Sequence, residues 1–124
     1  MKWCGIRWFC MPNPDIVRLR HMRDAAATAL QMAVGYDRAD LSASRMLAMA
    51  LTRCLEILGE AASKISPEFR SRYVRIPVSK MVSMRNRLIH AYFDVDLDIV
   101  WTTVHDDLPP LLVALDEALA AFDE

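Results

Sequence analysis

The stretch LAMALTRCLEILGEAASKI, residues 47–65, decides the fold class of this chain. Its apolar residues recur at steps of four and three, which is the spacing of one face of an α-helix. A helix with such a stripe is stable when the stripe packs against other helices. The residues of the stripe are Leu47, Leu51, Cys54, Leu58, Ala61 and Ile65.

Further helices are predicted on both sides of this stretch. Pro14 and Asp15 open a first helix that runs to about Gly35, since proline suits a helix start and glycine a helix end. The helix that carries the apolar stripe is expected over about 41–65, followed by a short helical turn at 67–73 and a third main helix at about 78–91.

A last helix is predicted to begin in the aspartate-rich segment FDVDLDIV, residues 93–100, because carboxylates stabilise a helix start. It continues to Leu108, and Pro109-Pro110 then kinks or restarts it before residues 111–122. The alternation of Asp94, Asp96 and Asp98 also resembles a calcium loop, but the required glycine and distal glutamate are missing. The whole pattern predicts an all-α fold, an antiparallel bundle of four to five helices with a proline-kinked C-terminal helix.

The length of 124 residues suits one domain. We expect residues 14–124 to form that domain and residues 1–13 to be an N-terminal appendage that need not be ordered. The three cysteines are an odd number without metal-type spacing, and the apolar start lacks a signal-peptide cleavage site, so we expect a cytoplasmic protein with reduced thiols. No segment is long and apolar enough to predict a membrane span.

Charge and hydropathy limit the partners. The net charge of −1 implies no broad basic surface, so nucleic-acid binding would need a local basic site. One small basic patch is predicted on the first helix, where His21 lies among Arg18, Arg20 and Arg23. It could contact RNA or an acidic partner, or be ordinary surface. The apolar content of 54% hints at a buried partner surface.

An eight-residue segment, RNRLIHAY, begins at Arg85 and concentrates polar chemistry in a helical region. If the helix continues, Asn86 and Arg87 lie one turn before His90 and flank it. Arg85 lies about 140° around the helix from His90, so the two would meet only through a long side chain, a distorted helix end or a second subunit. Tyr92 follows at or beyond the helix end, where its hydroxyl would be accessible.

Histidine and arginine together provide what RNA cleavage needs without a metal. His90 can take the proton of a ribose 2′-hydroxyl, and an arginine can bind the phosphate through two hydrogen bonds and offset its growing charge. The alternative is that Arg85 and Arg87 only pair with acids such as Asp94, Asp96 or Glu60. The chain has three glycines, and it contains no glycine-rich phosphate loop, zinc pattern or serine-nucleophile motif.

Three segments of the chain resemble the HepT-like branch of the HEPN superfamily. The first and second are IVRLRHMRDAAATAL (16–30) and LGEAASKIS (58–66), and the third is MRNRLIHAYFDVDLDIVWTTVHDDLPPLL (84–112). The resemblance extends over roughly residues 14–122. Its sharpest element is an R-x-x-x-x-H-x-Y pattern, which Arg85, His90 and Tyr92 meet.

This resemblance implies a helical bundle that forms homodimers in which two motifs face each other. It implies metal-independent RNA cleavage by Arg85 and His90, with Asn86 in a supporting role and no cofactor. Arg87 is a further supporting candidate from its position. Toxins of this family are paired with a minimal nucleotidyltransferase antitoxin that transfers AMP to the tyrosine of the motif, which here is Tyr92. Bulk and negative charge on that tyrosine would repel an RNA phosphate.

The leading hypothesis is therefore an endoribonuclease toxin that acts on RNA as a homodimer, or in a larger hetero-oligomer with its antitoxin. One alternative is a non-catalytic helical module that docks on a nucleotidyltransferase or presents substrate to it. A second alternative is a structural domain whose motif only holds a dimer together. Spacing in the sequence does not separate these hypotheses.

Overall fold

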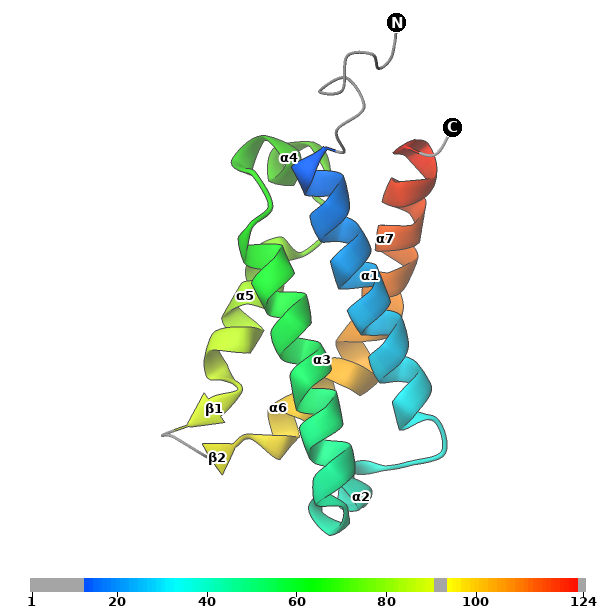
Figure 1. Cartoon of the computed structure of the whole chain (residues 1–124), viewed down its shortest axis with the longest axis vertical. Helices are drawn as coiled ribbons and strands as arrows, with labels where there is room; N and C mark the ends of the chain where they lie inside the picture. Colours follow the sequence, from blue (N-terminus) through cyan, green and yellow to red (C-terminus); the bar gives the residue numbers. More distant parts are fainter. Residues whose placement is uncertain (1–12, 91–93, 123–124) are drawn as a thin grey trace, which may run out of the picture.

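Four long helical segments run antiparallel to one another around a shared core (Figure 1). The fold is known from a computed structural model, which describes residues 13–90 and 94–122. The prediction of an all-α antiparallel bundle is confirmed. No helix within those two ranges is both long and apolar enough to cross a membrane. The four segments are α1 (Pro14–Ala33), α3 (Arg45–Ser63), α5 (Val78–Arg87) and the run of α6 (Leu97–Thr102), η2 (Thr103–Asp107) and α7 (Leu108–Phe122).

Helix α1 begins and ends where the sequence predicts. Asn13 caps it, because the Asn13 side chain accepts a hydrogen bond of 2.8 Å from the Asp15 amide. After the helix ends, Gly35 adopts a φ of +84°, which favours glycine. Except for Asn13, the predicted appendage of residues 1–13 lies outside the described residues.

The predicted helix at 41–65 is two helices, so its predicted start is wrong. The short helix α2 (Arg38–Ala43) precedes α3 and is separated from it by Ser44. Ser44 has an extended backbone, and its hydroxyl accepts a hydrogen bond of 3.1 Å from the Leu47 amide, which starts a new helix. Serine competes with helical hydrogen bonds in this way, and that competition interrupts the periodic pattern.

Helix α4 (Pro67–Arg72) is the predicted short turn, and it is joined to the start of α1. Ser66 caps α4 and also donates to Asp15, through its amide at 2.9 Å and its hydroxyl at 2.7 Å. These bonds hold one end of the bundle together.

The third main helix ends at Arg87, four residues before the predicted end. Leu88 turns into the core and is fully buried, and its carbonyl accepts a hydrogen bond of 2.8 Å from the Asp96 amide. Burying Leu88 and bonding its carbonyl to Asp96 replaces the next helical turn by a short antiparallel ladder. Its strands, β1 (Ile89–His90) and β2 (Asp94–Val95), pair Ile89 with Val95 and His90 with Asp94.

The C-terminal segment changes direction between α6 and α7 (Figure 1). Asp96 caps α6 as predicted, accepting hydrogen bonds of 3.1 Å from the amides of Asp98 and Ile99. Pro109 and Pro110 have no N–H to donate to the preceding turn. The backbone ahead of them widens into the π-helix η2, so the predicted proline kink is confirmed.

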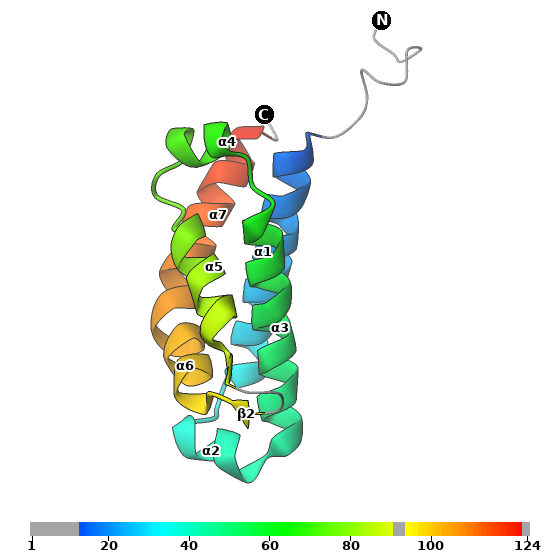
Figure 2. The same ribbon diagram turned by 90° about the vertical axis from the view of Figure 1, so that its left-hand side faces the viewer.

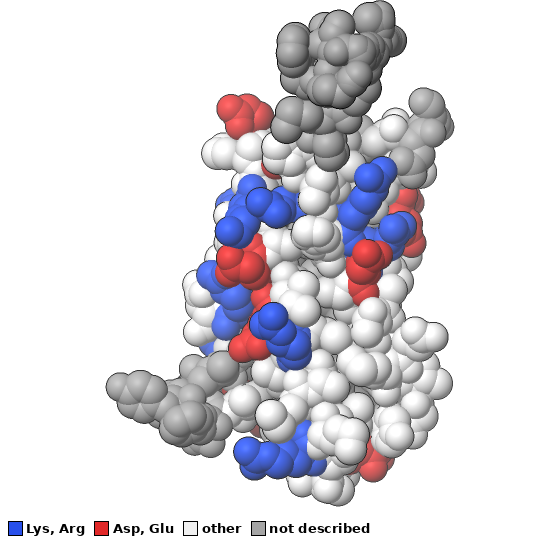
Figure 3. All heavy atoms as spheres, viewed as in Figure 1, with Lys and Arg blue, Asp and Glu red and all other residues white. Residues whose placement is uncertain are grey.

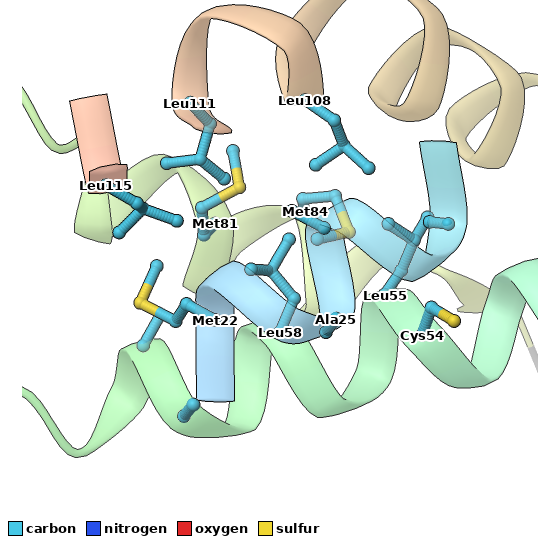
Figure 4. Packing of buried hydrophobic residues seen from close by; sticks show 14 of the residues in the cluster. Met22, Ala25, Cys54, Leu55, Leu58, Met81, Met84, Leu108, Leu111 and Leu115 are labelled. Carbon is cyan, nitrogen blue, oxygen red and sulfur yellow. The ribbon is translucent and has the colours of Figure 1, made fainter. Parts of the chain in front are cut away.

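The core lies where α1, α3, α5 and α7 meet (Figures 2 and 4). Leu55 and Leu58 of α3 are fully buried, as are Met22 of α1 and Met81 of α5. Cys54 also faces inward, and burial raises the pKa of its thiol, so a reactive thiolate is disfavoured. The apolar stripe that predicted the fold is therefore the centre of the molecule.

Replacing Leu58 by alanine should destabilise the fold by about 2–5 kcal/mol, because it leaves a cavity in the closed core. Chemical denaturation at fixed protein concentration measures this free energy of unfolding. Val74→Ala is the control, since Val74 is 75% exposed and should change stability by less than about 0.5 kcal/mol. Equal losses in the two variants would contradict this account of the core.

Candidate active site

Helices α3 and α5 lie unusually close together where Gly59 of α3 meets Arg85 of α5. A Cβ added at Gly59 would overlap the Cβ of Arg85 and lie 3.0 Å from its Cγ and 3.1 Å from its Cδ. Only a residue without a side chain fits this crossing. The aliphatic stem of Arg85 therefore lies directly against the backbone of α3.

The guanidinium group of Arg85 is held on two sides. Its Nη1 donates to Glu60 Oε1 at 2.8 Å, and its Nε and Nη2 donate to Asn86 Oδ1 at 3.3 and 3.2 Å. These bonds use three of the five N–H donors of an arginine. Counting bonds to described residues only, one N–H remains on each terminal nitrogen, and these N–H groups can donate to a phosphate.

The sequence left open the alternative that Arg85 only pairs with an acid, and Glu60 was one of the three acids considered. The structure shows this pair. Glu60 also pairs with Lys64 at 3.5 Å, and the Arg85 side chain remains 28% exposed. The ion pair thus orients the guanidinium without closing it off from solvent. The supporting role predicted for Asn86 has a matching contact here, since its side-chain oxygen fixes one edge of the guanidinium.

Sequence reasoning did not single out Gly59. The available signal was a glycine in the middle of an otherwise good helix, which is unfavourable unless another part of the chain must come close. Glu60 was considered only as one of three acids that could neutralise the motif. Which acid meets Arg85 depends on how α3 and α5 cross, and spacing alone does not give that crossing.

Arg87 does not join Arg85 in this protomer. It lies two residues further along α5, about 200° around the helix. There it lines a separate pocket of about 250 Å³ together with Lys80, Asp96 and Asp107. Within the described ranges the Arg87 side chain makes no hydrogen bond or ion pair.

His90 lies on β1 rather than on α5, so the prediction that Asn86 and Arg87 flank it on one helix face is wrong. The reason is the buried turn at Leu88, which ends the helix before His90 is reached. The backbone of His90 is paired with that of Asp94. Tyr92 lies outside the described residues.

No three histidine, cysteine, aspartate or glutamate side chains come together as a metal site in the described part of the chain. His105, for example, contacts one acidic side chain and one aromatic ring. Its ring is hydrogen-bonded to Asp106 at 2.8 Å and stacked on Trp101, and both side chains of the His105–Asp106 pair are largely exposed.

A family model and two relatives that match this chain are described as ribonucleases. A family model described as ribonuclease HepT-like matches residues 22–118. A probable ribonuclease HepT of Thermococcus cleftensis is 42% identical over 72 residues, which cover 58% of this chain and 66% of that protein. A protein of Caldanaerobacter subterraneus described as a putative RNase is 32% identical over 101 residues, 82% of this chain and 90% of its own length. No solved structure matches the chain.

Replacing Gly59 by alanine tests the close approach of α3 and α5. In an open helix this change would stabilise the protein by about 0.8–1 kcal/mol. Here we expect a loss of about 1–3 kcal/mol, because the new methyl group meets the Arg85 stem and pushes the helices apart. Denaturation of both proteins measures the sign of the change, and a more stable variant would contradict the contact.

Proposed function

Since the chain belongs to the HepT-like ribonuclease family, we propose that it is a metal-independent endoribonuclease, the toxin of a toxin–antitoxin pair. The observation that carries this proposal is the guanidinium of Arg85. Glu60 and Asn86 hold it at a fixed place, and two of its N–H groups make no bond to a described residue. The ribonuclease names of the relatives support the same reaction class.

In the proposed reaction His90 acts as the base and Arg85 as the phosphate-binding group. His90 takes the proton of a ribose 2′-hydroxyl, and the 2′-oxygen attacks the adjacent phosphorus. The bond to the 5′-oxygen breaks, and that oxygen takes up a proton from water. The products are a 2′,3′-cyclic phosphate and a 5′-hydroxyl end. Arg85 stabilises the negative charge that develops on the phosphate, and because it is already oriented it needs little rearrangement.

We propose that two copies of the chain form the active unit. Met46 and Met49 support this, because they are 81% and 60% exposed on the outer face of α3. Met49 also lines an open pocket of about 580 Å³ with Val95 and Leu97, next to the ladder that carries His90. A second copy that covers these apolar side chains would lie beside the motif and could contribute its own. Met81 and Met84, by contrast, belong to the core.

The proposed off-switch is Tyr92. A nucleotidyltransferase antitoxin would transfer AMP to its hydroxyl in the cytoplasm. The added phosphate would lie seven residues along the chain from Arg85, where its negative charge competes with RNA. The antitoxin would bind the toxin dimer in a larger complex.

The nuclease proposal predicts cleavage of total cellular RNA by the purified protein in the presence of a chelator. His90→Ala should reduce the rate by about 10²–10⁴-fold, the usual contribution of a general base. Arg85→Lys should remain impaired, because lysine provides a point charge and not a fork of donors. The products of the wild-type reaction should carry cyclic-phosphate ends.

Circular dichroism and molar mass in solution control for folding and assembly of these variants. If the wild-type protein is folded, unmodified and dimeric but cleaves nothing, the nuclease proposal fails. The chain would then be better described as a non-catalytic module that docks on a nucleotidyltransferase.

Silencing by AMP transfer predicts a specific effect of Tyr92→Phe. This variant lacks only the acceptor hydroxyl, so it should cleave RNA but escape the antitoxin. Growth of cells that express both proteins measures the escape, and the mass of the toxin shows whether AMP is attached. Full silencing of Tyr92→Phe would indicate that the antitoxin blocks the toxin without modifying it.

A further inference from the structure

An open groove of about 650 Å³ crosses the outer face of α3 and has Arg85 in its wall. Its floor is the stripe of α3 from Arg53 to Lys64, with Ile57 and Ala61 between them. At 1.5 Å per residue this stripe is about 16 Å long. Arg18 and His21 of α1 form the opposite wall. The small basic patch predicted from the sequence is therefore divided, because Arg23 instead pairs with Asp116 of α7.

The groove is basic although the whole chain is slightly acidic. Four arginine or lysine side chains and two glutamates line it, a net charge of +2 with His21 neutral, whereas the chain carries −1. Figure 3 shows basic and acidic side chains intermingled over α3 and α5 on this face. Each glutamate already has a cation beside it, since Glu56 lies 3.6 Å from Arg53 and Glu60 contacts both Arg85 and Lys64.

The basic groups of the groove are available for a ligand. The side chains of Arg18 and His21 make no hydrogen bond or ion pair with any described residue. Arg53 is 71% exposed and held only by its loose pair with Glu56, and Lys64 is 50% exposed. Positive side chains along an open groove are the pattern that follows a single-stranded nucleic-acid backbone.

We propose that this groove binds the RNA strand next to the phosphate held by Arg85, with Arg18 and Arg53 contacting flanking phosphates. The inference rests on the proposed ribonuclease function, and it assigns the path that the substrate takes across the protomer. From the phosphate at Arg85, the RNA strand would cross α3 and reach α1. One end of the groove adjoins the apolar pocket of Met49, because Arg53 and Glu56 line both. A second copy bound at Met46 and Met49 would therefore lie beside that end of the groove.

The test is binding of a 2′-O-methyl single-stranded RNA of about 12 nucleotides, a length that suits such grooves and a substrate that cannot be cleaved. The Kd is measured at 50 and 200 mM salt for the full chain and for Arg18→Gln combined with Arg53→Gln. Among the described residues, neither side chain forms a hydrogen bond or ion pair with Arg85 or Glu60. For single strands, each phosphate contact adds about 0.7 to the slope of log Kd against log salt concentration. Losing two contacts over this fourfold change in salt should therefore reduce the ratio of the Kd at 200 mM to the Kd at 50 mM by about sevenfold in the double variant.

The matched control is Arg72→Gln combined with Arg75→Gln, which removes the same charge from a surface outside the groove. There Arg72 and Arg75 lie near Glu117 of α7. The control should bind with the wild-type salt dependence. If the groove variant and the control have the same Kd and the same salt dependence, the proposal is wrong. A changed molar mass of the groove variant would also overturn it, because the groove would then be a contact between protein chains.

Cleavage of unmodified RNA separates this inference from the proposed function. The groove variant should need a higher RNA concentration to reach half of its maximal cleavage rate, since Arg18 and Arg53 are proposed to bind the substrate while Arg85 and His90 are intact. If the wild-type protein binds RNA through the groove but does not cleave it, the groove proposal stands and the nuclease proposal fails. If the wild-type protein cleaves RNA and the groove variant binds it normally, the nuclease proposal stands and the groove proposal fails.

Discussion

The contact between Gly59 and Arg85 is the constraint on which the site depends. Two helices with ordinary side chains pack 8–10 Å apart, but the missing side chain at Gly59 lets the stem of Arg85 rest on the backbone of α3. This approach brings Glu60 within 2.8 Å of the guanidinium, while Asn86 holds its other edge. A long, flexible side chain is thereby fixed before any substrate arrives, so less conformational entropy is lost on binding.

The same crossing connects the core to the chemistry. Leu58 and Gly59 are neighbours on α3, one facing the closed core and the other facing Arg85. On α5, Met81 and Met84 fill the core, and Arg85 follows at once. The core that stabilises the bundle therefore sets the position of the arginine. A change that loosens the packing of α3 against α5 should disturb the site even without touching a polar residue.

Much of this was predictable from residue patterns. The stripe from Leu47 to Ile65, the Pro14 helix start, and the caps at Ser66 and Asp96 follow from local rules, and the structure has all of them. The end of α5 was not predictable in this way. Leu88 continues a helical apolar pattern and still has helical backbone angles, but its carbonyl bonds to the amide of Asp96, a residue eight positions further along.

The site was predictable as a set of residues but not as an arrangement. The motif singled out Arg85, Asn86 and His90, yet the acid that orients Arg85 and the glycine beneath it come from α3. Arg87 was grouped with them by proximity in sequence, and a rotation of 200° places it in another pocket. Long-range packing of this kind has no local signal apart from an isolated glycine in a helix.

The most direct measurement is a crystal structure of the protein bound to a 2′-O-methyl single-stranded RNA. The account predicts a phosphate whose oxygens lie within hydrogen-bond distance of both terminal nitrogens of Arg85, with Asn86 still bound to the Nε edge. RNA bound on a surface that does not include Arg85, with the guanidinium still paired only to Glu60 and Asn86, would contradict it.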